Sequence, residues 1–220
     1  MQAYTHIIWD FNGTVLDDVK ECLACADRLL QAHHLPPLGG LAAYRRVFGF
    51  PIIDYYRRMG FDFSKISYDE LAIEWVGYYR AATQTPALCP GVEEALARLK
   101  HAGYPQLILS ATHRELLRTQ LDQLGIGDVF EELLAQDNIH AHGKSALGME
   151  WRARHPHARP VMIGDTDHDA EVAKKIGADC LLVCCGHQSR DTLLRTSARA
   201  VFDTPREAVE WILSDNEKHN

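Results

Sequence analysis

Residues 9–18 read WDFNGTVLDD and directly follow the apolar run His6–Ile8. An apolar strand that ends in an aspartate, with Gly13-Thr14 close behind it, is typical of a loop that handles phosphate. Asp10 is then the candidate nucleophile, because it stands where the strand ends. Position 12, where a second carboxylate would transfer protons, holds Asn12 instead. This raises the question of whether the loop has lost its proton-transfer residue or never needed one.

Length and composition set the first limits. The 220 residues suffice for one large domain, or for a core domain with an insertion. Hydrophobic residues make up 46% and charged residues 24%, as in an ordinary globular protein. The net charge of −7 argues against nucleic acid or an anionic membrane as a partner. Because we find no secretion signal and no apolar stretch near the roughly 18 residues of a membrane helix, we expect a cytoplasmic protein.

Short apolar runs alternate with helical patterns along most of the chain. We predict strands at His6–Trp9, Gln106–Ser110, Glu132–Ala135, Pro160–Gly164, Cys180–Cys184 and Ala200–Phe202. Between them, a helix over Val92–Ala102 ends at Gly103. A capping-box pattern at Thr112–Glu115 predicts the start of the next helix. The alternation predicts an α/β fold, with a Rossmann-like parallel sheet covered by helices on both faces.

Residues 17–86 interrupt this alternation with a block of helical patterns. Ser67-Tyr68-Asp69-Glu70 is a capping box that predicts the start of its last helix. We therefore predict a core domain of residues 1–16 and 87–220, and an inserted α-helical cap domain of residues 17–86. Such a cap would cover the carboxyl edge of the sheet, where open α/β folds bind their ligands.

Polar residues follow the strands at that same edge. The first strand ends in Asp10 and the second in Ser110, Lys144 comes after the third, and the fourth ends at Asp165. A carboxylate nucleophile, a hydroxyl, an ammonium and further carboxylates suffice for phosphoryl transfer through an aspartyl-phosphate. Hard oxygen ligands of this kind suit Mg²⁺. We interpret Cys22 and Cys25 as helix packing, because no second pair completes a zinc site.

These motifs resemble those of the haloacid dehalogenase superfamily over essentially the whole chain. The residues that carry the resemblance are Asp10-Phe11-Asn12-Gly13-Thr14-Val15, Ser110, Lys144, and Gly164-Asp165-Thr166-Asp167-His168-Asp169. Within the superfamily, Leu35-Pro36-Pro37-Leu38 and Pro90-Gly91-Val92 are similar to the phosphoglycolate phosphatase-like branch. The resemblance implies a Mg²⁺-dependent phosphatase acting on a small phosphorylated metabolite, as a monomer or homodimer.

The resemblance also implies a role for each site residue. It gives Asp10, Asn12 and Lys144 as catalytic residues, Thr14, Ser110, Ala111 and Lys144 as substrate-binding residues, and Asp10, Asn12, Asp165 and Asp169 as Mg²⁺ ligands. Asp10 would attack phosphorus, and the backbone carbonyl of Asn12 would bind the metal. In the family, position 12 commonly carries the aspartate that exchanges protons with the leaving group and with water.

Asn12 leaves three interpretations open. The chain is a slow or specialised phosphatase, a non-catalytic phosphate-binding or regulatory protein, or an enzyme for another superfamily reaction such as phosphonate hydrolysis. Cap residues should select the substrate. Candidates to bind a substrate carboxylate are Arg45, Arg46, Arg57 and Arg58, although such arginines are more often solvated. We expect the aromatic residues Tyr55, Tyr56, Trp75, Tyr78 and Tyr79 to form the core of the cap.

Overall fold

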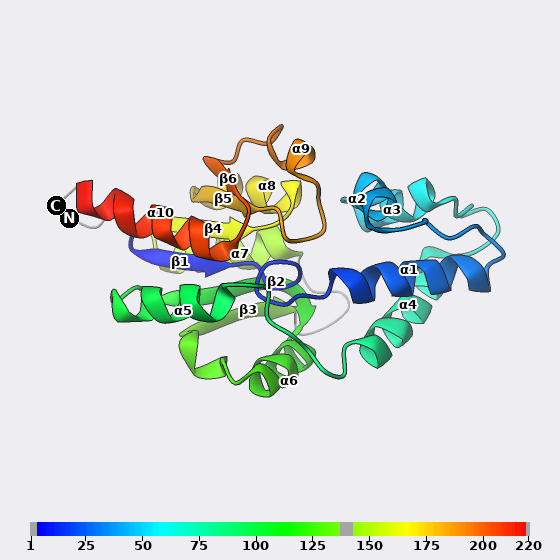
Figure 1. Cartoon of the computed structure of the whole chain (residues 1–220), viewed down its shortest axis with the longest axis horizontal. Helices are drawn as coiled ribbons and strands as arrows, with labels where there is room; N and C mark the ends of the chain where they lie inside the picture. Colours follow the sequence, from blue (N-terminus) through cyan, green and yellow to red (C-terminus); the bar gives the residue numbers. More distant parts are fainter. Residues whose placement is uncertain (1–3, 137–142, 219–220) are drawn as a thin grey trace.

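The computed structural model describes residues 4–136 and 143–218 of the chain. It has two parts, a sheet flanked by helices and a group of helices at one end of that sheet (Figure 1). None of the helices in the described ranges is both long enough and apolar enough to cross a membrane.

The described strands form one parallel sheet in the order β3-β2-β1-β4-β5-β6. Their bounds are β1 His6–Trp9, β2 Gln106–His113, β3 Glu132–Gln136, β4 Pro160–Gly164, β5 Asp179–Val183 and β6 Ala200–Phe202. The predicted α/β fold with a parallel sheet is confirmed. The strand order reverses direction at β1 and β4, and the crevice beyond the carboxyl ends of such a pair is where open α/β folds bind ligands.

Helices cover both faces of the sheet. One face packs against α5 Val92–His101, α6 Arg114–Leu124 and α10 Pro205–Lys218, and the other against α7 Lys144–Arg154, α8 Asp167–Ile176 and the short α9 Arg190–Leu193. A short 3₁₀ helix, Gly127–Val129, lies between α6 and β3. Successive side chains of β1 point to opposite faces of the sheet, so Ile7 and Trp9 pack against one helix layer and Ile8 packs against the other.

The inserted helices form a cap with its own hydrophobic core. They are α1 Val19–Ala32, α2 Leu41–Val47, α3 Ile52–Met59 and α4 Tyr68–Ala82. Leu29, Leu30, Tyr44 and Leu71 are completely buried among them, separately from the two clusters of the sheet. The predicted capping box at Ser67 is confirmed, since Ser67 and Glu70 each accept a hydrogen bond from the other's backbone amide.

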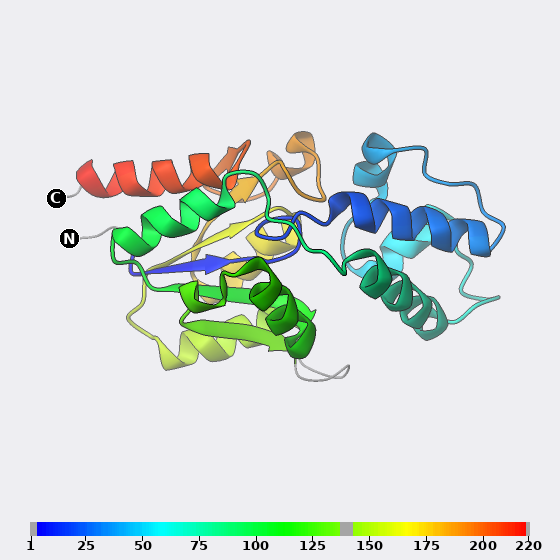
Figure 2. The same cartoon turned by 60° about the horizontal axis from the view of Figure 1, so that its bottom comes forward.

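Two neighbouring chain segments join the cap to the sheet. The amide of Asp17 donates to the carbonyl of Ala87, and the amide of Cys89 donates to the carbonyl of Val15, both at 2.9 Å. Figure 2 shows β1 running towards α1, so the carboxyl ends of the strands face the cap. The division at residues 16/17 and 86/87 stays a prediction, although these paired segments lie beside it.

The start of α6 differs from the prediction. β2 continues past Ser110 to His113, and α6 begins at Arg114 without a side-chain cap. The Thr112 hydroxyl, predicted to cap this helix, instead donates to Asn12 Oδ1 at 2.7 Å. The capping-box prediction was wrong because a partner 100 residues away in the chain outcompetes the local backbone amide.

Candidate active site

Five predicted site residues converge at the carboxyl edge of the sheet. Asp10 follows β1, Ser110 lies in β2, Lys144 begins α7, Asp165 follows β4, and Asp169 lies in the first turn of α8. All five are buried, with at most 8% of their surface exposed. The parallel topology brings these residues together, because the carboxyl ends of all the strands lie at one edge.

Lys144 links two of these carboxylates. Its ammonium donates to Asp10 Oδ1 and to Asp169 Oδ1. Burial alone would lower the pKa of Lys144, but the two carboxylates outweigh it and raise the pKa. Burial also raises the pKa of Asp10 to about 6, against the lowering effect of Lys144. Asp10 is therefore a carboxylate with one fixed cation beside it and little water around it.

The site contains more buried negative than positive charge. Among the described buried side chains are the carboxylates of Asp10, Asp18, Asp165 and Asp169, against the cations of Lys144 and His187. His187 counts as a cation because its pKa is raised to about 9, with the charge of Asp18 outweighing burial. A divalent cation would balance the difference between these charges.

The donor set fits a hard cation. One oxygen from each of Asp10, Asp165 and Asp169 lies within 4.8 Å of the others. Burial raises the pKa of Asp165 well above its usual range, and the neighbouring carboxylates of Asp10 and Asp169 add to the effect. Carboxylate oxygens in this number suit Mg²⁺. The predicted roles of these residues and of the Asn12 carbonyl as metal ligands stay predictions.

Glycines make room for Asp165. A Cβ atom on Gly186 would lie 2.0 Å from Asp165 Oδ2, and one on Gly13 would lie 2.5 Å from the same atom. Gly13 also has a φ of +76°, which favours glycine. The amide of His187 donates to Asp165 Oδ2 at 2.6 Å. The backbone is therefore packed directly against this carboxylate.

The predicted substrate-binding residues differ in their positions. Ser110 and Ala111 line the cavity next to Asp10, as an oxygen-binding loop requires. Thr14 is completely buried, and its hydroxyl lies 3.3 Å from Asp10 Oδ2 and 3.2 Å from Asp165 Oδ1. Thr14 thus contacts the two carboxylates and is not part of the described cavity lining. A contact between Thr14 and substrate stays a prediction without support from this geometry.

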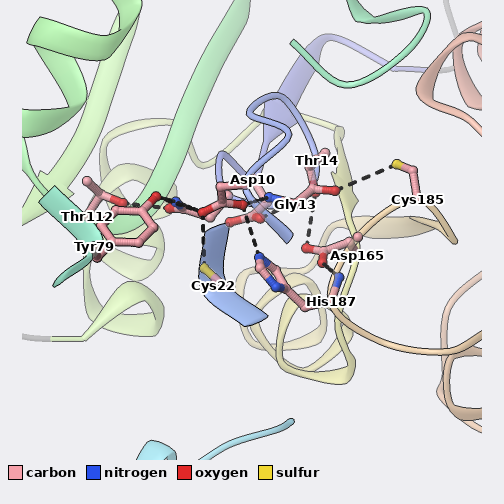
Figure 3. Close-up of polar contacts among 12 residues, drawn as sticks. Asp10, Gly13, Thr14, Cys22, Tyr79, Thr112, Asp165, Cys185 and His187 are labelled. Atoms are coloured by element: carbon pink, nitrogen blue, oxygen red, sulfur yellow. Dashed lines mark hydrogen bonds and ion pairs between the residues drawn. The ribbon is translucent and has the colours of Figure 1, made fainter. Parts of the chain in front are cut away.

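Asn12 has hydrogen-bond partners on both sides of its amide, among them Tyr79 and Thr112, which are labelled in Figure 3. Its Nδ2 donates to Asp18 Oδ2 and to the Tyr79 hydroxyl oxygen, both at 2.8 Å, while its Oδ1 accepts from Thr112. Tyr79 in turn donates to Asp18 Oδ2 at 2.7 Å. Since a carboxylate only accepts hydrogen bonds, the amide group of Asn12 is matched to Asp18 as a donor. The amide is thereby fixed in one orientation beside the nucleophile.

Asp18 is paired with His187 across the junction of cap and sheet. His187 Nε2 lies 3.2 Å from Asp18 Oδ1, and the amide of Gly13 donates to the same oxygen at 3.0 Å. Burial would raise the pKa of Asp18, but the charge of His187 outweighs it and lowers the pKa. His187 Nδ1 lies 2.8 Å from the Tyr44 hydroxyl. One buried ion pair therefore connects the first loop, the loop after β5 and the cap.

A cavity of about 480 Å³ lies between this site and the cap. Its lining on the sheet side includes Asp10, Asn12, Lys144 and Asp165. On the cap side the described lining is mainly aromatic and aliphatic: Tyr44, Phe48, Phe50, Ile52, Tyr55, Tyr56, Tyr68, Ala72, Trp75, Val76 and Tyr79, with Arg80. A small phosphorylated molecule could place its phosphate on the sheet side and its remainder against the cap.

Comparison with known proteins agrees with this geometry. A protein-family model described as haloacid dehalogenase-like hydrolase matches residues 7–183. The chain belongs to this family. The family resemblance expected from the four motifs is confirmed, and with it the expectation of an enzyme.

Relatives of this haloacid dehalogenase-like hydrolase are named phosphatases. A phosphoglycolate phosphatase of Pseudomonas putida is 24% identical over 210 residues, covering 91% of this chain and 76% of the relative. "Probable phosphatase IndB" of Dickeya dadantii is 26% identical over 213 residues, covering 92% of this chain and 91% of the relative. The solved structure of a haloacid dehalogenase-like family hydrolase from Streptococcus pneumoniae has the same fold, with a TM-score of 0.79 and 20% sequence identity. The match covers 96% of this chain and 99% of that one.

Sequence reasoning missed four residues of the site in this hydrolase. They are Asp18, Tyr79, Thr112 and His187, the partners of Asn12 or of one another. Asp18 had a signal, because a second acidic residue follows Asp17 in the first loop. His187 lies in a loop without a pattern, and its contact with Asp18 depends entirely on the tertiary structure.

Cys22 is buried in the cap core, as expected for helix packing, and it also lies next to this group. Its Sγ is 3.6 Å from Asp18 Oδ2, and donor atoms of Asp18, Cys22 and His187 lie within 4.8 Å of one another. Cys25 is buried in the cap core. Because Asp18 already accepts hydrogen bonds from Asn12, Gly13 and Tyr79, these contacts account for the cluster.

Proposed function

We propose that this protein is a Mg²⁺-dependent phosphatase that hydrolyses a small phosphorylated metabolite through an aspartyl-phosphate on Asp10. The observation that carries the proposal is the buried carboxylate of Asp10, in contact with Lys144 at one end of the cavity and close to Asp165 and Asp169. Nucleophile, cation and metal-binding oxygens thus face the same small volume. The phosphatase names of the relatives support the same reaction class.

The first half-reaction transfers the phosphoryl group to Asp10. A carboxylate oxygen of Asp10 attacks phosphorus, and the bond from phosphorus to the leaving oxygen breaks. Lys144 neutralises charge on Asp10 and on the phosphoryl group, while the Ser110 hydroxyl and the Ala111 amide hold phosphoryl oxygens. A magnesium ion held by Asp10, Asp165, Asp169 and the Asn12 carbonyl would supply electrophilic stabilisation of the phosphoryl oxygens.

The second half-reaction regenerates Asp10. Water attacks phosphorus, the bond between phosphorus and Asp10 breaks, and inorganic phosphate leaves. Asn12 occupies the position from which a carboxylate would accept a proton from that water, and an amide does not exchange protons at neutral pH. Positioned acid/base catalysis contributes about 10²–10⁴-fold, so slow turnover limited by breakdown of the aspartyl-phosphate follows.

Phosphate release from p-nitrophenyl phosphate in the presence of Mg²⁺ tests the proposal. We expect Asp10→Asn to abolish release, while Asp17→Asn, a change in the same loop, retains it. Mass spectrometry of rapidly quenched protein should find a phosphoryl group on Asp10. Wild-type protein that binds inorganic phosphate but releases none from any ester would instead support the phosphate-binding role.

Phosphonate hydrolysis has no support from the cap lysines. A Schiff-base mechanism needs an amine that faces the substrate, whereas Lys20 is exposed and the Lys65 side chain is 80% exposed. Neither residue is part of the described cavity lining.

A further inference from the structure

Aromatic rings line the cap side of the cavity. Tyr56 is 3% exposed, and Trp75 stacks on Tyr79 with centroids 4.9 Å apart and planes at 14°. Phe50, with 38% of its surface exposed, stacks on His168 of α8 with centroids 4.5 Å apart. Flat apolar walls of this kind recognise rings by contact area and stacking. The expectation that the cap aromatics form the cap core is therefore incomplete, because several also face the cavity.

Arg45 and Arg57, two of the cap arginines expected to bind a carboxylate, have other partners. Arg45 donates to the carbonyls of Cys184, Cys185 and Gly186, in the loop that follows β5. Arg57 pairs with Asp54. None of these cap arginines, nor Arg46 or Arg58, belongs to the described cavity lining.

A carboxylated substrate would therefore meet little positive charge from the cap. Of the cap arginines, Arg80 lines the cavity within the described residues, and its side chain is exposed. Lys144 is already paired with Asp10 and Asp169. A carboxylate on the leaving group would lose its water against mainly aromatic walls, with the exposed Arg80 as the cap arginine of the described lining, which is costly.

Asn12 is an independent indication of the leaving group. An aliphatic alcohol is about as weak an acid as water, so its alkoxide is strongly basic and needs a proton as it departs. A phenol has a pKa of about 10, so a phenolate departs without one. A site that holds an amide at the proton-donor position therefore suits an aryl ester.

We infer that the substrates are aryl phosphates, whose uncharged aromatic leaving group lies against Trp75, Tyr56 and Phe50; this inference rests on the phosphatase function proposed above. As an Asp10 oxygen bonds to phosphorus, the bond between phosphorus and the aryl oxygen breaks. The electron pair leaves with that oxygen, and the phenolate takes its proton from solvent. Water then releases phosphate and restores Asp10.

Binding of two stable phosphonates to the full-length protein with Mg²⁺ tests the inference apart from turnover. We expect phenylphosphonate to bind at least tenfold more tightly than 3-phosphonopropionate, measured by titration calorimetry. Trp75→Ala should weaken phenylphosphonate binding about tenfold, as expected for one lost ring contact. Ile73→Ala is the matched control, because Ile73 lies on the same helix, is 74% exposed and is not in the described lining.

The opposite preference would overturn the inference. Tighter binding of 3-phosphonopropionate, weakened by Arg80→Ala and unchanged by Trp75→Ala, would place a carboxylate against the cap. In kinetics, phosphoglycolate hydrolysed with a larger kcat/KM than phenyl phosphate would contradict the aryl class and leave the phosphatase proposal standing. Preferential phenylphosphonate binding without hydrolysis of any ester would support the ligand class and contradict the phosphatase proposal.

Discussion

Asn12 and Asp18 lie 2.8 Å apart, measured from Asn12 Nδ2 to Asp18 Oδ2, and Tyr79 is hydrogen-bonded to both. A carboxylate at position 12 would meet the carboxylate of Asp18 at this distance. Like charges so close cannot both ionise, and one of the two carboxyls would keep its proton. The amide at position 12 is thus the neutral side chain that hydrogen-bonds to Asp18 without this conflict.

Exchanging the two side chains should restore the missing proton transfer. The double variant Asn12→Asp/Asp18→Asn keeps an amide and a carboxylate in contact but places the carboxylate beside the nucleophile. For a phosphate ester with a poor leaving group, we expect kcat to rise by about 10²–10⁴-fold, the usual contribution of a positioned acid/base group. Steady-state kinetics with an aliphatic phosphate ester measure this effect.

The single variants separate the effect of a carboxyl group at position 12 from the effect of an amide at position 18. Asn12→Asp alone should gain less than the exchange, because a carboxyl that keeps its proton can protonate a leaving group but cannot accept a proton from water. Asp18→Asn alone should gain nothing. Peptide mass spectrometry must accompany the assay, since deamidation at Asn12-Gly13 would create the same aspartate. An exchange variant no faster than wild type on any ester contradicts the interpretation of Asn12 as a missing acid/base residue.

At the scale of secondary-structure elements, the patterns in the sequence predicted more of the sheet than of the site. The predicted and observed bounds of β1, β4 and β6 coincide, because a short apolar run bounded by polar or turn residues favours a strand. The placement of Asp10 and Asp165 at one edge followed from the parallel topology. Thr112 and His187 could not be placed, because their partners Asn12 and Asp18 are distant in the chain, and local patterns carry no information about such contacts.

The edge formed by β1 and β4 should be stabilised by Mg²⁺. Because the buried carboxylates there outnumber the buried cations, we expect Mg²⁺ to raise the melting temperature of the full-length protein, as any ligand of the folded state does. Asp165→Asn should abolish most of the Mg²⁺ effect, since it removes one of the predicted ligands, and should change the melting temperature without metal much less. Thermal denaturation with and without Mg²⁺ measures the effect in both proteins.

Asp167→Asn is the matched control for this experiment. Asp167 lies two residues further on, is partly exposed, and accepts a hydrogen bond from Gln188 at 2.8 Å. It should retain the full Mg²⁺-dependent increase. An equal loss in both variants would place the metal elsewhere than on the predicted ligands.

At the scale of the whole molecule, the cap and the sheet are connected by the buried ion pair of Asp18 and His187. Asp18 directly precedes α1 of the cap, and His187 lies in the loop after β5. Phe48, between α2 and α3, stacks on the His187 ring with centroids 4.8 Å apart. The charge of His187 therefore contributes to the attachment of the cap.

Stability should fall as the pH rises from 6.5 to 9. The pKa of His187 is raised to about 9 in the folded protein, compared with about 6.5 in an unfolded chain. Its stabilisation is complete below pH 6.5 and is lost as the pH rises through 9, by roughly 3 kcal/mol at most. The lowered pKa of Asp18 affects stability in the opposite direction, because its contribution is lost as the pH falls, and it matters only below about pH 4.

Urea unfolding at pH 6.5 and pH 9 measures this loss. In Asp18→Asn the main cause of the raised pKa of His187 is absent, so the free energy of unfolding should change less between the two pH values. Equal changes in the variant and the wild type would show that the pair does not contribute to the pH dependence.

The two paired segments that join cap and sheet also bear on how such an enzyme can diversify. Because residues 15–17 and 87–89 run side by side, the cap enters and leaves the core at a single place. A foreign cap could be grafted there without breaking any strand of the sheet. Such a graft would replace the walls around the leaving group and also Asp18 and Tyr79, which hold Asn12. Substrate range and the proton chemistry at position 12 would therefore be inherited together, as one module.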